Sequence, residues 1–270
     1  CNKGIYCGMS PELGLFSPQS VVWKIHSDPS MVVGGIRALL QQALHPVAMD
    51  GVAKNSNFRE DTWGRLQRTG DYVATLSFAP RKDAEALAAR VRSVHTKLGL
   101  DDPHLLLWVH MALVDSFLDI AIRSGMQLAP HDQDQYVKEM VDFARLVGID
   151  PNTVPSNTEE LKSYFENIAP ELSASDDAKR VALFLTFPPM PNTIRFATPA
   201  APAWASLSAL ATASLPLWAR KLYAIPSLPG QDVLTNAALV ATRSTLKILP
   251  ENIFQPPLLK EALIRWGIAS

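Results

Sequence analysis

Apolar residues recur every three or four positions along most of the chain, a period typical of helices with one buried face. Two runs show it clearly. One extends from Val32 to Leu44 before Pro46, and the other from Leu106 to Phe117 before Gly125. No stretch alternates apolar and polar residues with period two, which strands of a half-buried sheet would require. The pattern therefore predicts an all-α protein of about ten helices without a sheet.

Capping residues mark several helix ends in the sequence. Ser17-Pro18, Asp28-Pro29 and Asp102-Pro103 each place an N-capping side chain before a proline, and Pro is favoured in the first helical turn. Gly99 follows another periodic segment and predicts its C-terminal cap. The expected helices cover about 32–44, 61–78, 81–98, 106–117, 132–147, 158–168, 176–187, 203–223, 231–249 and 257–266.

The chain shows one continuous organisation. No repeat of fixed period or low-complexity run appears, and the Pro-rich joints at 188–191 and 226–229 separate helices. A chain of 270 residues that is 47% hydrophobic can bury one large core. We expect a single domain over 1–270, with its core at about 13–187 and C-terminal helices at about 198–270.

Charge and cysteine content argue against several classes of partner and site. With 25 basic and 26 acidic residues the net charge is -1, which disfavours nucleic-acid partners. Cys1 and Cys7 are the only cysteines, which excludes a disulfide framework and a cysteine-based zinc or iron–sulfur site. We expect a cytoplasmic protein that begins at a trimmed or processed end, with lipid-modified Cys1 as a lesser alternative.

The stretch 198–219 carries no charged residue. Three prolines interrupt it, so it predicts a loop and a buried helix and not a membrane span. Shallow peripheral contact with a membrane surface is the alternative, because two tryptophans in this stretch and two cations directly after it suit an interface. These four residues are Trp204, Trp218, Arg220 and Lys221.

Any chemistry rests on histidines, because the sequence has no phosphate-binding Gly loop, no G-x-S-x-G motif, no H-E-x-x-H motif and no calcium loop. His104 and His131 are expected in solvent, and His26, which closes a short helix, is expected to be a surface or capping residue. His45, His95 and His110 lie on or beside apolar helical faces. A hydrogen bond would explain His110, and His45 before Pro46 could cap carbonyls.

His95 is the histidine with the clearest apolar neighbours. Leu87, Val91, Val94 and Leu98 share its helical side, so the ring is expected to point toward the core. A core histidine with a satisfied hydrogen bond is the alternative interpretation.

A second pattern precedes His95. Arg65, Arg68 and Thr69 stand at i, i+3 and i+4 and share one side of a helix. Apolar neighbours such as Trp63 and Leu66 indicate that part of this side is buried, and a buried Arg requires an anionic or acceptor partner. A solvated basic face is the alternative.

Five segments in order, within roughly residues 13–125, resemble the DUF2236 family of MpaB and latex-clearing-protein oxygenases. They are Leu15-Phe16-Ser17-Pro18-Gln19-Ser20, Ala43-Leu44-His45-Pro46-Val47-Ala48, Arg65-Leu66-Gln67-Arg68-Thr69, Val91-Arg92-Ser93-Val94-His95, and Asp102-Pro103-His104-Leu105-Leu106-Leu107-Trp108-Val109-His110. The resemblance implies a globin-like helical core and a haem b cofactor.

The resemblance also implies roles for individual residues. His95 would be the axial ligand of the haem iron. Arg65 and Thr69 match the family's R-x-x-x-T pattern in the haem pocket and are the expected catalytic residues, Arg65 by polarising bound oxygen and Thr69 by donating a hydrogen bond. Arg68 stands where latex-clearing proteins have a Lys that caps the iron, but Arg cannot deprotonate to do so. It is expected to bind the cofactor by charge, as is Arg65. No catalytic base is assigned, although Asp50 and Asp61 lie near enough in sequence.

One departure concerns the connection after His95. Only 96–101 join it to Asp102, whereas relatives usually carry a longer segment with Gly and Tyr, which weakens inference of the substrate.

The sequence thus predicts a haem-dependent oxygenase or oxidase that activates O2 on an apolar, isoprenoid-like or lipid-like substrate. A non-catalytic haem- or lipid-binding helical protein is the alternative, and a purely structural helical protein is a third. Substrate, cleavage position, electron donor and oligomeric state stay open.

Overall fold

The computed structural model describes residues 13–55, 62–188, 190, 192–249 and 256–269. Within these ranges the chain forms α-helices, eleven of them seven residues or longer, two 3-10 helices and no strand. The helices are α1 (Val21–His26), α2 (Met31–Gln42), α3 (Pro46–Asn55), α4 (Thr62–Phe78), α5 (Arg81–Leu98), α6 (Pro103–Arg123), α7 (Pro130–Val147), α8 (Thr158–Ile168), α9 (Asp176–Thr186), α10 (Asn192–Ala197), α11 (Ala200–Ala213), α12 (Leu217–Leu222), α13 (Gln231–Ile248) and α14 (Pro257–Arg265). The 3-10 helices are η1 (Pro151–Thr153) and η2 (Ala169–Glu171). The all-α prediction is confirmed, and the globin-like arrangement stays a prediction.

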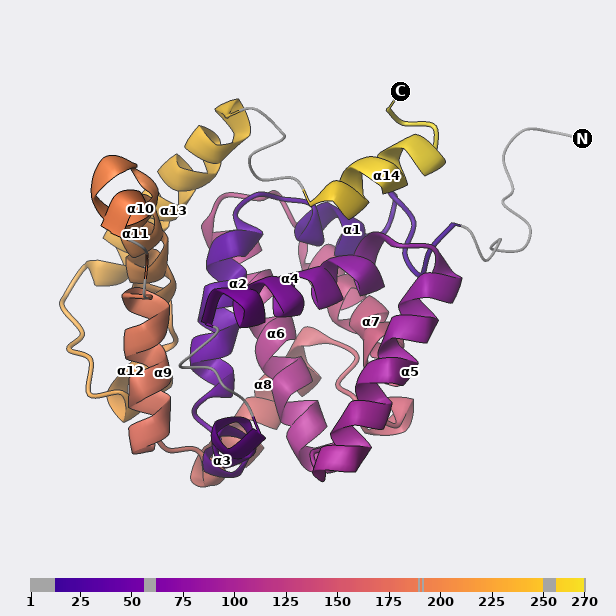
Figure 1. The fold of residues 1–270 in the computed structure, drawn as a ribbon, viewed down its shortest axis with the longest axis horizontal. Coiled ribbons are helices and arrows are strands. Elements are labelled where there is room, and N and C mark those ends of the chain that lie inside the picture. Colours follow the sequence, from indigo (N-terminus) through magenta and orange to yellow (C-terminus); the bar gives the residue numbers. More distant parts are fainter. Residues whose placement is uncertain (1–12, 56–61, 189, 191, 250–255, 270) are drawn as a thin grey trace, which may run out of the picture.

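The centre of the molecule is the pair α2 and α6, which pack along their lengths (Figure 1). Gly34 allows the close approach, because a Cβ there would lie 3.2 Å from the ring of Phe117. Arg37 joins the two helices by charge. It is buried, and its guanidinium lies 2.8 Å from Asp115 and 3.4 Å from Asp119, both on α6. The same guanidinium donates to the Ser214 carbonyl beyond α11.

The other helices surround this pair. Figure 1 shows α9 to α13 on one side of α2, and α5 and α7 on the other side of α6. α14 returns across α4, where Leu259 and Ala262 pack with Trp23 and Phe78. The largest apolar cluster contains buried residues from Leu15 to Leu239, so the N-terminal segment and α13 share one core.

α6 is long and apolar enough to cross a membrane by length and composition alone, and it is the one such helix among the described residues. Burial covers 56% of its most apolar window. No helix within 198–219 is long and apolar enough by the same criterion, in agreement with the prediction that this stretch is not a membrane span.

Several predicted boundaries agree with the structure. α5 covers the predicted 81–98, and Asp102 caps α6 by accepting from the His104 amide at 2.9 Å. The starts at Ser17-Pro18 and Asp28-Pro29 were wrong by two or three residues. α1 begins at Val21 after the cap Ser20, and α2 begins at Met31, because both prolines lie in preceding turns.

Other expectations were wrong. The predicted helix 203–223 is two helices, α11 and α12, because Pro216 lacks the amide hydrogen that a continuous helix requires at that position. α3 and α10 were not predicted.

Candidate functional site

The end of α5 fixes the backbone of His95. Gly99 adopts the left-handed conformation (φ 66°), and its amide donates back to the carbonyls of the last turn. The Leu100 amide donates to the His95 carbonyl at 2.8 Å. This glycine-terminated cap anchors the turn that presents His95, and the chain then passes directly to Asp102 and α6. The short 96–101 connection is therefore a compact helix–helix corner.

The His95 side chain is half-buried, and its Nδ1 is buried without a hydrogen-bond partner among the described residues. Desolvation lowers the pKa of His95, and the negative charge of Asp101 opposes that shift. The ring is thus biased toward the neutral form, which is the form that can bind a metal through a ring nitrogen.

The apolar stripe beside His95 is not a core face, contrary to the sequence prediction. Val94 is 47% exposed and Leu98 is 44% exposed, while Leu87 and Val91 are only partly buried. The reason is that α5 lies at the edge of the molecule and buries its small side, represented by Ala84 and Ala88. His95 consequently stands beside an open apolar surface that an apolar ligand could cover.

The two cations of α4 differ in their surroundings. Arg65 is half-buried, and desolvation, with the neighbouring charge of Arg68, lowers its pKa. Arg68 and Thr69 are exposed. The Thr69 hydroxyl donates to the Arg65 carbonyl at 3.0 Å, a bond within the helix. Burial on this side of α4, expected from the sequence, therefore holds for Arg65 and not for Arg68 or Thr69.

α4 and α5 meet at the 79–80 corner and diverge from it (Figure 1). Arg65 lies near the start of α4 and His95 near the end of α5, so each lies at the end of its helix away from that corner. The start of α4 reaches α11, where Trp63 and Trp204 pack edge to face at 4.9 Å. Whether Arg65 and Thr69 share a cavity with His95 stays a prediction. Of the two acidic residues considered as bases, Asp50 pairs with Lys54 at 2.6 Å, and Asp61 lies outside the described residues.

His110 is buried, as expected, and packs against Phe143 with ring centroids 5.7 Å apart. Burial lowers its pKa to about 4, although a hydrogen bond to the Met140 backbone favours the charged ring. Its Nε2 has no hydrogen-bond partner among the described residues. Tyr72 packs against the same phenylalanine, and burial raises the pKa of its phenol to about 12. These polar groups within the apolar interior were only partly anticipated from the sequence.

His26 was expected at the surface, and this was wrong. The ring is buried between Ser77 and Tyr136, with Nδ1 2.7 Å from the serine oxygen and Nε2 3.1 Å from the tyrosine oxygen. The signal was present in the sequence, because His26 follows the buried Val22 by four residues and shares its helical side.

Three histidines remain. His131 is exposed, as predicted, on the first turn of α7. His104 is half-exposed and binds Glu171.

His45 does not cap carbonyls as proposed from the sequence. It is buried and precedes α3, where its Nδ1 faces the Ala48 amide at 3.5 Å. The ring therefore lies at the start of a helix, where free amides and not free carbonyls are found.

These features define a helical protein with a half-buried histidine beside an exposed apolar surface and two cations on the preceding helix. The family model described as "ER-bound oxygenase mpaB/B'/Rubber oxygenase, catalytic domain" matches residues 23–244. The chain belongs to this family of oxygenases, and the protein is accordingly an oxidoreductase by family. No curated protein and no solved structure matches it significantly.

Proposed function

We propose that the protein is a haem b-dependent oxygenase or oxidase that acts on an apolar, isoprenoid-like or lipid-like substrate. The observation that carries this proposal is the buried Nδ1 of His95, which has no hydrogen-bond partner among the described residues, on a ring beside exposed apolar side chains. An unpaired buried polar atom is costly unless a ligand or partner satisfies it. Membership of a haem oxygenase family supports the same assignment.

The residues present fit a haem. A neutral His95 would bind the iron through one ring nitrogen and donate the hydrogen on the other, for which Asp101 offers a nearby carboxylate. Val94 and Leu98 would contact the apolar macrocycle or substrate. Haem b would supply the activation of O2, which protein side chains cannot perform.

The cations of α4 would contribute charge. Arg65 is half-buried, and a desolvated guanidinium gains most from an anionic partner such as a haem propionate. Arg68 adds a second positive charge on the same side. Thr69 would have to redirect its hydroxyl from the Arg65 carbonyl to donate to a ligand. Exclusion of water from the apolar surface would strengthen each of these interactions.

The test is replacement of His95 by Ala, followed by haem reconstitution and an absorption spectrum. Ala is the best helix former, so α5 should persist and the far-ultraviolet circular dichroism should be unchanged. We expect His95→Ala to lose most of the Soret absorbance of the wild type and all O2-dependent turnover of an isoprenoid or fatty-acyl substrate.

The matched control is Thr96→Ala, which alters an exposed neighbour on the same helical turn. It should retain the Soret band. A wild-type protein that takes up no haem, or a His95→Ala variant with wild-type absorbance, would contradict the proposal. Haem binding without any turnover would support the non-catalytic alternative.

A further inference from the structure

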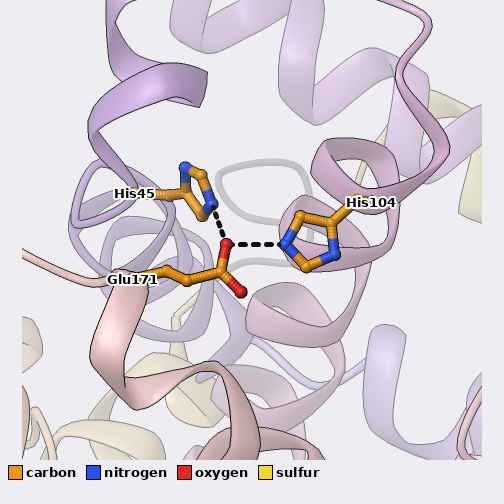
Figure 2. A group of neighbouring side chains, drawn as sticks. All are labelled: His45, His104 and Glu171. Carbon is orange, nitrogen blue, oxygen red and sulfur yellow. Dashed lines mark hydrogen bonds and ion pairs between the residues drawn. The ribbon is translucent and has the colours of Figure 1, made fainter.

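Two other histidines and a glutamate converge at the start of α6. Figure 2 shows His45, His104 and Glu171 with their side chains pointing toward one another. His45 precedes α3, His104 lies in the first turn of α6, and Glu171 ends η2. None of the three was assigned to a metal site from the sequence, and none belongs to the Arg65–His95 pattern.

The backbone holds these three segments in place. Asp102 caps α6 at the His104 amide, as described above, and the Ser173 amide donates to the Leu44 carbonyl at 2.8 Å. The second bond ties the chain after η2 to the residue before His45. Ligand-bearing residues that are distant in sequence are thus positioned by bonds that do not involve their side chains.

The three ligand atoms lie close enough together to surround one metal ion. Glu171 Oε2 lies 2.8 Å from His104 Nε2 and 3.5 Å from His45 Nε2, and all the ligand atoms lie within 4.8 Å of one another. In a tetrahedral zinc site with bonds of about 2.0–2.1 Å, ligand atoms are about 3.3 Å apart. A movement of about half an ångström that separates Glu171 from His104 would bring this pair to that spacing, and both side chains are half-exposed.

The inner ligand is the best fixed. The side chain of His45 is only 4% exposed, and its Nε2 makes no hydrogen bond of normal geometry within the described part of the chain. Its ring packs near those of His104 and Trp108. This buried ring nitrogen points at a carboxylate that is too far away for a good hydrogen bond, so there is room for an ion between the two groups.

We propose that His45, His104 and Glu171 bind one divalent transition-metal ion of the zinc class. Two imidazole nitrogens and a carboxylate oxygen are ligands that zinc favours, and such three-residue sites keep a fourth position for water or another small ligand. The solvent exposure of His104 and Glu171 leaves that position accessible.

Binding requires a defined protonation state. Each histidine must offer the Nε2 lone pair and carry its hydrogen on Nδ1. For His45 this replaces the contact from the Ala48 amide, which at 3.5 Å is too long to be strong. Glu171 must be ionised, and the hydrogen bond from His104 already lowers its pKa. Burial, together with the negative charge of Glu171, raises the pKa of the Tyr164 phenol.

The full-length protein, treated with a chelator that leaves haem iron in place, provides the test. Calorimetric titration with Zn²⁺ should show one ion per chain, and the variants His104→Ala and Glu171→Gln should each lose at least tenfold in affinity. Both altered side chains are half-exposed, so these variants should fold. His131→Ala is the matched control, since His131 is an exposed histidine beside a single carboxylate, and it should bind like the wild type.

Titration with Co²⁺ gives a second readout. The wild type should show the intense visible bands of four-coordinate Co²⁺, and the two site variants should not. No saturable Zn²⁺ binding, or equal binding by the wild type and both variants, would overturn the proposal. The Soret absorbance of reconstituted His104→Ala should be that of the wild type, so this test and the His95 test fail independently.

Discussion

At the scale of single residues, His26 shows how a titratable side chain becomes part of the core. The Ser77 hydroxyl donates its hydrogen to the Val73 carbonyl at 2.7 Å, so its oxygen can only accept from His26 Nδ1. His26 Nε2 then accepts from the Tyr136 hydroxyl. Burial, with the charge of His110, lowers the pKa of His26 to about 3. The neutral ring is satisfied at both nitrogens and connects α1, α4 and α7.

This assignment predicts the effect of Ser77→Ala. The substitution leaves the His26 Nδ1 hydrogen buried without an acceptor, which should lower the free energy of unfolding by about 1–3 kcal/mol. Urea denaturation measures it. The control is Ser244→Ala, an exposed serine that makes the same bond to the carbonyl four residues earlier. It should change stability by no more than about 0.5 kcal/mol. Equal stability of the two variants would show that His26 does not depend on Ser77.

At the scale of elements, α5 and α4 each contain a glycine, but the two glycines differ in backbone conformation. Gly99 has a positive φ and ends α5 one turn after His95, whereas Gly70 lies inside α4 without a positive φ. A Cβ at either position would meet no atom within 4 Å. The effect of adding a side chain at these two positions therefore depends on backbone conformation and not on contacts with neighbours.

The predicted effects of alanine have opposite signs. Gly99→Ala forces a side chain into the left-handed region and should destabilise the protein by about 1–2 kcal/mol. Gly70→Ala removes the entropic cost of glycine in a helix interior and should stabilise it by about 0.5–1 kcal/mol. Denaturation midpoints of the two variants check this. If both variants shifted the midpoint in the same direction, the backbone conformation of the glycine would not determine the effect of alanine.

At the scale of the whole molecule, Arg37 connects the central helices with the C-terminal half. Besides the pairs with Asp115 and Asp119, its guanidinium donates to Gln41 and Ser116. The Ser214 carbonyl that it reaches also accepts from Arg123, which pairs with Asp232 of α13 at 3.4 Å. α2, α6 and α13 are thus joined through one network of charged and polar groups with the buried Arg37 at its centre.

Arg37→Met should lower the free energy of unfolding by about 3–5 kcal/mol, because it leaves the acidic groups of α6 without their buried cation. Burial already raises the pKa of Asp119 despite the attraction of Arg37. Lys54→Met is the comparison, since the Lys54–Asp50 pair is 71% and 56% exposed and such pairs contribute at most about 1 kcal/mol. A similar loss of unfolding free energy in the two variants would indicate that the Arg37 network contributes no more to stability than an exposed ion pair.

The sequence by itself determined the class of the fold and the family of the protein. Helical periodicity is local, so α5 and its Gly99 cap, and the Asp102 cap of α6, could be read from neighbouring residues. Four of the five segments that resembled the oxygenase family lie within the family match over 23–244, and the segment 15–20 precedes it. Pro216 also carried its information locally, although the prediction of one helix across it overlooked that signal.

The tertiary structure alone decided which faces are covered and which distant side chains meet. The position of α5 at the edge of the molecule left Val94 and Leu98 exposed, although their spacing resembles that of core residues. Packing of α1 against α4 and α7 buried His26. His104 and Glu171 are separated by 67 positions, and no local pattern relates them. Period and capping depend on adjacent residues, whereas burial and convergence depend on how helices pack, which the local sequence does not specify.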